Sequence, residues 1–125
     1  KYYNILDLEE KNRRNCNVDI ADHVDIHNNC CMLIGRNSML KIGRRTSISY
    51  NTIINAGVGN IVIGENTMIA GNCYIVSNDH DINTTLSVRD CGHIIGDVHI
   101  GNNVWIGYNI GNCVGIANNS KDRRT

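Results

Sequence analysis

The chain has no proline and no phenylalanine, and none of its 125 residues belongs to a long apolar run. A membrane-spanning helix needs about 20 consecutive apolar residues, so the sequence predicts no membrane span. Residues 1–4 lead into charged residues instead of the apolar stretch that a secretory signal requires. Both absences argue against a protein that is inserted into a membrane or exported.

A net charge is missing as well, because twelve Lys and Arg residues balance twelve Asp and Glu residues. Proteins that bind nucleic acid or an acidic membrane surface generally carry an excess of positive charge. The basic pairs of this sequence are isolated and typical of solvated surface: Arg13-Arg14, Arg44-Arg45 and Arg123-Arg124. We therefore expect no nucleic-acid partner.

Cysteine is present, but without the spacing of a structural zinc site. None of the six cysteines forms a Cys-x-x-Cys pair, which such sites normally use. Cysteines scattered along a chain in this way are more typical of free thiols in a reducing compartment than of a disulfide framework. The cysteines therefore favour a cytoplasmic location and no structural metal.

Isoleucine recurs in steps of six residues. The step runs through Ile42, Ile48 and Ile54, starts again at Ile63 and Ile69, and returns at Ile100 and Ile106. A period of six does not hold residues on one face of an α-helix, and antiparallel strands would alternate at a period of two. An aliphatic residue followed by a small residue and polar residues is the hexapeptide signature of a parallel β-helix. The sequence therefore predicts an all-β solenoid.

The repeat has a direct physical interpretation. A three-sided solenoid turns a corner about every six residues, so that the aliphatic residue of each hexad points inward and three hexads complete one coil. Small residues after the isoleucine suit the tight corner, and asparagines tolerate turn geometry. Cys73 occupies a short-residue position of its hexad and is predicted to pack as a small apolar group.

The pattern divides the chain into three segments. Residues 1–17 are polar and non-periodic, with a short helix expected over residues 4–14; residues 18–109 carry the β-helix; residues 110–125 form an irregular or truncated final coil and tail. The spacing from Ile54 to Ile63 is nine residues, which predicts an outward bulge over residues 56–60.

The longest break lies between Ile75 and Ile94, the next residue that fits the inward pattern. Residues 77–93 contain turn formers, charges and two histidines, with little periodicity. Loops of this length are uncommon in compact domains and are usually functional or disordered, and insertions in solenoids tend to lie on the binding face. We therefore expect the chemistry of the protein in the inserted loop 77–93.

Two segments around this break resemble the hexapeptide-repeat O-acetyltransferases, which include galactoside and maltose acetyltransferases and enzymes that acetylate capsule or lipopolysaccharide sugars. The segments are Ile75-Val76-Ser77-Asn78-Asp79-His80-Asp81-Ile82 and Gly96-Asp97-Val98-His99-Ile100-Gly101-Asn102-Asn103-Val104-Trp105-Ile106-Gly107. The similarity covers residues 34–109. It implies a left-handed parallel β-helix, a homotrimer with active sites between subunits, and acetyl transfer from acetyl-CoA to a sugar hydroxyl.

In that family a loop histidine is the general base, and His80 stands at the matching position. A sugar hydroxyl attacks a thioester as its proton is removed, and imidazole accepts a proton near neutral pH. The acetyl group then passes directly to the hydroxyl without a covalent acyl-enzyme, and a backbone N–H would stabilise the oxyanion. Asp79 and Asp81 flank His80 and fit solvated carboxylates, although Asp79 is also a candidate for binding an acceptor hydroxyl.

The resemblance places further residues near the substrates. Trp105, the only tryptophan, should point outward, either beside the acetyl or acceptor site at a subunit boundary or in plain trimer packing. Asn55 lies near the position from which a neighbouring subunit contributes to acceptor binding. The positions that match the pantetheine groove and other CoA contacts, with Trp105, are Gly107, Tyr108, Asn109, Ala117 and Lys121.

Two other functions stay open at this stage. A hexapeptide β-helix also supports zinc-dependent carbonic anhydrases, which need three histidines converging across a subunit boundary. His93 and His99 lie one hexad apart and hence on different faces, which argues against such a metal site. The solenoid would alternatively be a non-catalytic assembly module, and within the acetyltransferase hypothesis an amine could replace the acceptor hydroxyl.

Overall fold

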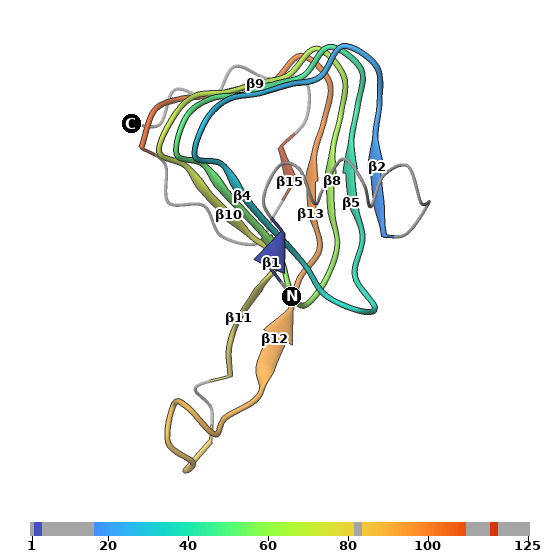
Figure 1. Cartoon of the computed structure of the whole chain (residues 1–125). Helices are drawn as coiled ribbons and strands as arrows, with labels where there is room; N and C mark the ends of the chain where they lie inside the picture. The colour runs from blue at the N-terminus through green and yellow to red at the C-terminus, as the bar shows by residue number, and fades with distance from the viewer. Residues whose placement is uncertain (1, 4–16, 82–83, 110–115, 118–125) are drawn as a thin grey trace.

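The computed structural model describes residues 2–3, 17–81, 84–109 and 116–117, and every regular element among them is a β-strand (Figure 1). The strands in chain order are β1 (Tyr2–Tyr3), β2 (Val18–Ile20), β3 (Asp25–Ile26), β4 (Cys31–Ile34), β5 (Leu40–Ile42), β6 (Ser47–Ile48), β7 (Ile53–Ala56), β8 (Ile61–Ile63), β9 (Met68–Ile69), β10 (Tyr74–Val76), β11 (Asn78–His80), β12 (His93–Ile95), β13 (Val98–Ile100), β14 (Trp105–Ile106) and β15 (Ile116–Ala117).

The chain winds around three faces, which overlap as a three-sided outline in Figure 1. We name each face by one of its strands. The β4 face contains β1, β4, β7 and β10; the β5 face contains β2, β5, β8, β13 and β15; the β6 face contains β3, β6, β9 and β14. All pairings within the faces are parallel except that of β1 with β4. The predicted all-β solenoid of parallel coils is therefore confirmed.

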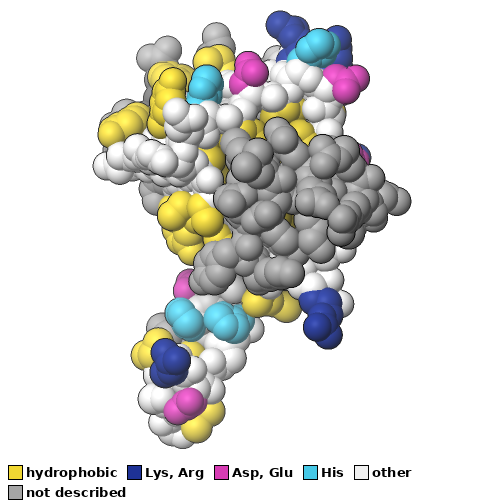
Figure 2. All heavy atoms as spheres, in the orientation of Figure 1, with side chains coloured by type: hydrophobic (Ala, Val, Ile, Leu, Met, Phe, Trp, Pro, Cys, Tyr) yellow, Lys and Arg dark blue, Asp and Glu magenta, His cyan; other side chains and the backbone are white. Residues whose placement is uncertain are grey.

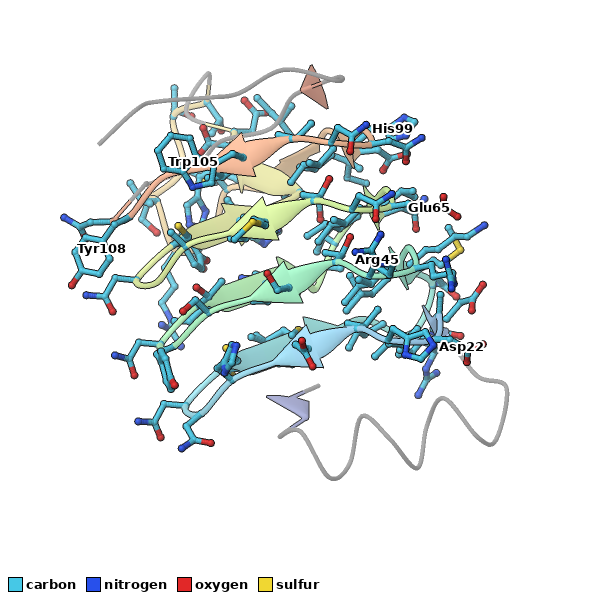
Figure 3. All side chains as sticks on the ribbon, turned by 90° about the horizontal axis from the view of Figure 1, so that it is seen from above. Asp22, Arg45, Glu65, His99, Trp105 and Tyr108 are labelled. Carbon is cyan, nitrogen blue, oxygen red and sulfur yellow. The ribbon has the colours of Figure 1, made fainter. Side chains whose placement is uncertain are left out.

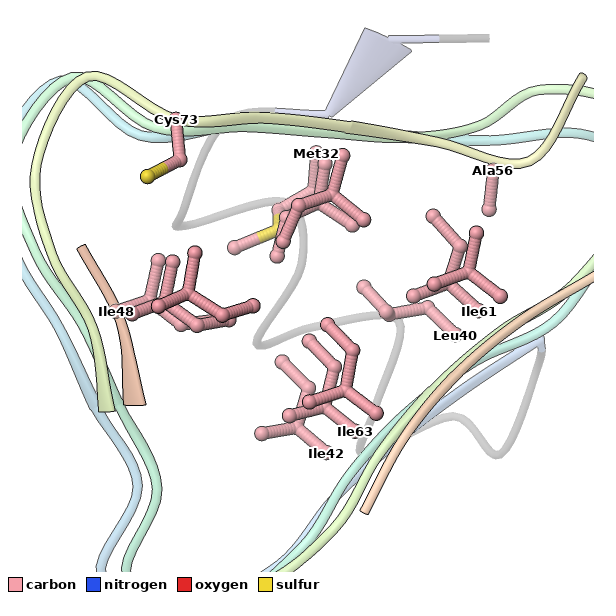
Figure 4. Close-up of a cluster of buried hydrophobic side chains, with 14 of the residues drawn as sticks. Met32, Leu40, Ile42, Ile48, Ala56, Ile61, Ile63 and Cys73 are labelled. Atoms are coloured by element: carbon pink, nitrogen blue, oxygen red, sulfur yellow. The ribbon is translucent and has the colours of Figure 1, made fainter. Parts of the chain in front are cut away.

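The isoleucines of the six-residue repeat form the core, as the sequence predicts. Those with 1% or less of their surface exposed are Ile42, Ile48, Ile54, Ile63, Ile69 and Ile75. Figure 4 shows the buried side chains of successive coils lying over one another in columns. Because full burial of one such side chain is worth about 1.5–3 kcal/mol, these columns supply much of the driving force for stacking.

Two corners are built from residues with left-handed backbone. His23, Arg45, Asn66 and Asn103 recur at the corner between the β5 and β6 faces, and Asn29, Asn51, Asn72 and Asn109 recur at the corner between the β6 and β4 faces, all with φ between 55 and 62°. Asparagine visits this region at lower cost than most L-residues. Asparagine at these positions therefore reflects corner geometry repeated in successive coils.

Glycines after the inward isoleucines let neighbouring coils approach. A Cβ atom on Gly43 would lie 2.6 Å from the carbonyl carbon of Gly64, directly above it in the next coil. Beside these glycines, the buried Thr46 donates its hydroxyl to the Gly64 carbonyl at 2.6 Å. Small residues at these corners are thus required by the contact between coils, as expected.

The third corner lies between the β4 and β5 faces, and it contains the residues by which each coil exceeds three hexads. It contains residues 35–39 in one coil and 57–60 in the next, so the bulge predicted for residues 56–60 is present, with Ala56 itself buried in β7. In the following coil the same corner expands to residues 78–97 and includes β11 and β12, which pair antiparallel and project from the prism (Figure 1). We call residues 78–97 the arm.

One prediction about this break is wrong. Ile94 was expected to resume the inward pattern, but 51% of its surface is exposed and it pairs with Asp79 inside the arm. The inward pattern resumes at Val98, which is 2% exposed and pairs with Ile61. The excursion is therefore longer than the predicted loop 77–93, and it is a hairpin over much of its length.

The ends of the chain add strands that the sequence pattern did not indicate. Tyr2–Tyr3 forms β1 and pairs antiparallel with β4, and Ile116–Ala117 forms β15 and pairs with β13. The short helix expected over residues 4–14 lies outside the described residues, as do Lys121 and most of the final segment 110–125.

Candidate functional site

The arm brings His80 and His93 together. They are directly opposed partners on β11 and β12, and their ring centroids lie 5.1 Å apart with planes tilted by 33°. Both side chains are exposed. In Figure 2, histidine side chains gather where the arm leaves the body of the molecule. The predicted base therefore has a second imidazole as its nearest ring neighbour.

The root of the arm is fixed to the prism. Ser77 is fully buried, and its hydroxyl donates to the Val58 carbonyl at 2.7 Å. Its own carbonyl accepts a hydrogen bond from Gly96 N at 3.0 Å, which closes the base of the hairpin. Because His80 is only three residues from this anchor, its backbone position is tied to the solenoid and its ring remains open to solvent.

Polar neighbours surround the two histidines. The amide Nδ2 of Asn78 lies 3.5 Å from Nδ1 of His93. Asp79 accepts a hydrogen bond at 2.8 Å from the backbone N–H of His80, and Asp81 donates its backbone N–H to the Gly92 carbonyl at 2.8 Å. Since successive side chains of a strand point to opposite sides, the Asp79 carboxylate and the His80 ring leave β11 on different faces.

His93 is the neighbour that sequence reasoning missed. The sequence shows it only as one of the histidines of the inserted loop and as a zinc-ligand candidate beside His99, and its spacing from His80 carries no periodic signal. The pairing depends on the register in which β11 and β12 meet, and this register is set by the length of chain that connects the two strands. A turn this long has no sequence signature that fixes register, so the partner of His80 was not predictable.

The tip of the arm exposes apolar side chains to solvent. Leu86 and Val88 each expose about 60% of their surface. Behind them Cys91 is buried, with its thiol donating to the Val88 carbonyl at 2.9 Å, and Ser87 donates its hydroxyl to Asp90 at 2.7 Å. These local bonds give the tip a defined shape, while its outer apolar side chains have no cover within the described part of the chain.

Trp105 points outward, as predicted. It is 40% exposed, and it pairs with Met68, which is 59% exposed, on the outside of the β6 face (Figure 3). The arm leaves from the corner between the other two faces (Figure 1). A single chain therefore does not bring Trp105 and His80 together.

The residues that follow Trp105 are fixed by the preceding coil. The Tyr108 ring lies over Gly71, and its hydroxyl accepts a hydrogen bond from Asn72 at 2.8 Å. Gly107 is buried, and its carbonyl accepts a hydrogen bond from the Cys73 thiol at 3.2 Å. Asn109 is an exposed corner residue with φ of 61°. Tyr108 thus presents an ordered aromatic edge at the corner between the β6 and β4 faces.

The two remaining candidate positions lie on other faces. Asn55 is half-buried on the β4 face, where it donates to the Tyr74 hydroxyl at 2.9 Å and accepts from Gly57 N at 2.9 Å. Its amide already has a partner on each side, so an acceptor would have to share it. Ala117 pairs with Ile100 on the β5 face.

Metal-ligating side chains do not gather in groups of three within the described ranges. The same part of the chain contains no helix long and apolar enough to cross a membrane. Among the thiols, burial raises the pKa of Cys30, whose Sγ donates to the Ser49 carbonyl at 3.1 Å. Cys30 is therefore a weaker nucleophile at neutral pH than a free thiol.

Comparison with known proteins finds a likeness in fold. No family model and no curated protein sequence matches the chain. A crystal structure of a point mutant of AntD, an N-acyltransferase from Bacillus cereus, in complex with dTDP and coenzyme A, matches with a TM-score of 0.53 and 19% identity, over 88% of this chain and 68% of that one. A second AntD mutant, with dTDP-4-amino-4,6-dideoxyglucose and coenzyme A, matches with a TM-score of 0.42 and 18% identity, over 88% and 75%.

Proposed function

We propose that this chain is a left-handed β-helix acetyltransferase that moves an acetyl group from acetyl-CoA to a hydroxyl of a sugar or surface-polysaccharide precursor. The observation that carries the proposal is the position of His80, an exposed imidazole on an arm whose root is anchored to the solenoid. The likeness of the fold to a CoA-binding N-acyltransferase supports it. The scattered thiols support a cytoplasmic location.

In this mechanism His80 removes the proton of the acceptor hydroxyl as the oxygen attacks the thioester carbonyl, and the same proton can then be passed to the departing CoA thiolate. General-base catalysis of this kind is worth about 10²–10⁴ in rate. A backbone N–H would stabilise the oxyanion of the tetrahedral intermediate. Acetyl transfer is direct, so no nucleophilic side chain is needed.

The proposal includes a homotrimer with its active sites between subunits. Trp105 and His80 lie on opposite sides of the prism, so a site that uses both needs two copies of the chain. The outward side chains of the β4 face are also largely apolar, which is typical of a covered surface. They are Cys31, Leu33, Ile53, Asn55, Tyr74 and Val76.

Roles for the other candidates follow from the same proposal. Asp79, Asn55 and Trp105 would contact the acceptor, and the ordered edge at Gly107, Tyr108 and Asn109 would border the groove for the pantetheine arm. Ala117 and Lys121 would contribute to CoA binding beyond that groove. No metal takes part in the proposed reaction.

An amine acceptor is the second candidate. AntD, whose fold this chain shares, is an N-acyltransferase and was crystallised with dTDP. The same base and the same CoA groove would serve an amino group, because only the acceptor atom changes. A nucleotide-linked amino sugar therefore belongs in any test beside neutral sugars.

The test measures CoA release from acetyl-CoA with a panel of sugars and nucleotide-linked amino sugars. We expect turnover with one acceptor class, and we expect kcat of His80→Ala to fall by about 10²–10⁴ because the base is removed. Product analysis by mass spectrometry and NMR distinguishes an ester from an amide. The result decides between the hydroxyl and the amine as acceptor.

His99→Ala is the matched control, because His99 is another exposed histidine, placed on β13 of the β5 face and outside the arm. It should retain wild-type activity. Wild-type turnover by His80→Ala would rule out the proposed mechanism. Absence of acetyl-CoA binding by the wild-type protein would favour the non-catalytic assembly module instead.

A further inference from the structure

We propose that His80 and His93 together form a reversible binding site for a divalent transition-metal ion such as Zn²⁺. The site is separate from any catalytic zinc centre, because it consists of two protein ligands from one hairpin and completes its coordination with water. Imidazole nitrogen is a preferred ligand for this class of ion. Two such side chains at directly opposed strand positions are the smallest set of protein ligands that can chelate one ion.

The distance between the rings fits a shared ion. An imidazole nitrogen binds Zn²⁺ at about 2.0–2.1 Å, and the ring centre lies roughly 1.2 Å behind that nitrogen. With a tetrahedral angle at the metal, two coordinating rings then have centres roughly 5 Å apart. The observed separation of His80 and His93 is 5.1 Å. Chelation therefore needs rotation of the rings but no movement of β11 against β12.

Asn78 is placed to orient one of the ligands. It precedes His80 by two residues on β11, so the two side chains lie on the same side of the strand. Its amide lies 3.5 Å from Nδ1 of His93, which leaves Nε2 of His93 for the ion. A ligating histidine commonly uses its second nitrogen in this way, and rotation of the amide group would present its oxygen to a protonated Nδ1.

The surroundings favour a hydrated cation. Both rings are exposed, so an ion reaches them without opening the structure. The described residues of the hairpin carry the carboxylates of Asp79, Asp81 and Asp90 against the single guanidinium of Arg89. A local excess of negative charge raises the concentration of cations near the arm.

Binding at this site would affect catalysis, a consequence that rests on the proposed function. An ion on His80 occupies the lone pair that would accept the proton of the acceptor. Acetyl transfer should then fall as Zn²⁺ is added and return when a chelator removes it. The ion would act as an inhibitor, and the reaction itself would proceed without it.

The experiment follows the imidazole ¹⁵N resonances of the full chain during titration with Zn²⁺, a readout that separates histidine sites from binding at thiols. We expect the signals of His80 and His93 to shift together along one binding curve. In His93→Asn the midpoint for His80 should rise at least about tenfold, which corresponds to the loss of one ligand. His99→Asn should leave the curve unchanged.

Three results would overturn the metal site. These are no shift of either histidine at millimolar Zn²⁺, shifts of the two residues at different Zn²⁺ concentrations, or an unaltered midpoint for His80 in His93→Asn. Circular dichroism confirms that each variant is folded. If Zn²⁺ binds as expected but leaves acetyl transfer unaffected, the role of His80 as base fails and the metal site stands.

Discussion

Single polar side chains at the inner corners link one coil to the next. The hydroxyl of Thr67, which is fully buried, donates to the Gly101 carbonyl at 2.8 Å and accepts from Val104 N at 3.3 Å. Cys73 plays a related part at the next corner, where its thiol donates to the Gly107 carbonyl. The prediction that Cys73 packs as a small buried group is confirmed, and its hydrogen bond adds a link that the sequence pattern did not indicate.

Replacement of Thr67 by valine preserves the shape of the side chain and removes both hydrogen bonds. Because the Gly101 carbonyl and the Val104 N–H would lose this partner in the interior, we expect the free energy of unfolding to fall by about 1–3 kcal/mol. Urea denaturation measures the change. The same substitution at the exposed Thr85 should cost no more than about 0.5 kcal/mol, and equal losses at the two sites would contradict the linking role.

At the scale of elements, the sequence predicted what the six-residue period determines and little beyond it. Inward isoleucines such as Ile48 and Ile69 and the outward Trp105 follow directly from the repeat. The prediction for Ile94 is wrong because a single isoleucine does not show whether it begins an inward hexad or belongs to an exposed strand. Ile94 and Ile95 are consecutive residues of β12, and both are exposed. Hairpin register, and with it the partner of His80, depends on contacts between residues far apart in the chain.

The arm is an added element that the prism does not need. The corner it replaces is four residues long one coil earlier, at residues 57–60, between positions that align with Ser77 and Val98. In a shortened protein, residues 78–97 are replaced by a copy of this four-residue corner. The connection then becomes shorter by a little over two doublings in length, and for a flexible loop the lower closure entropy would stabilise the folded protein by about 1.4 kcal/mol. We expect the shortened protein to unfold at the same or a higher temperature, by calorimetry.

The same shortened protein should bind acetyl-CoA and fail to transfer the acetyl group, because the cofactor groove of the proposal lies outside the arm and the base lies on it. Unfolding of the shortened chain at room temperature would show that the arm is part of the core. Retained transfer activity would show that the base lies elsewhere.

At the scale of the whole molecule, the proposed site should exist only where two copies meet. His80 leaves one corner of the prism, and Trp105 projects from the face opposite that corner. In a cyclic trimer each boundary would combine the arm of one copy with the β6 face of its neighbour. Two inactive variants can therefore restore each other, since each supplies the residue that the other lacks.

We expect His80→Ala and Trp105→Ala to be strongly impaired alone, and a mixture of the two, unfolded and refolded together, to regain activity. With random assembly at equal amounts, about one boundary in four pairs an intact His80 with an intact Trp105, so activity should approach about a quarter of the wild-type value. Separately refolded variants, combined afterwards, are the control and should remain inactive until subunits exchange. Failure of the co-refolded mixture to gain activity would place the whole site within one chain, which the separation of these two residues on the prism argues against.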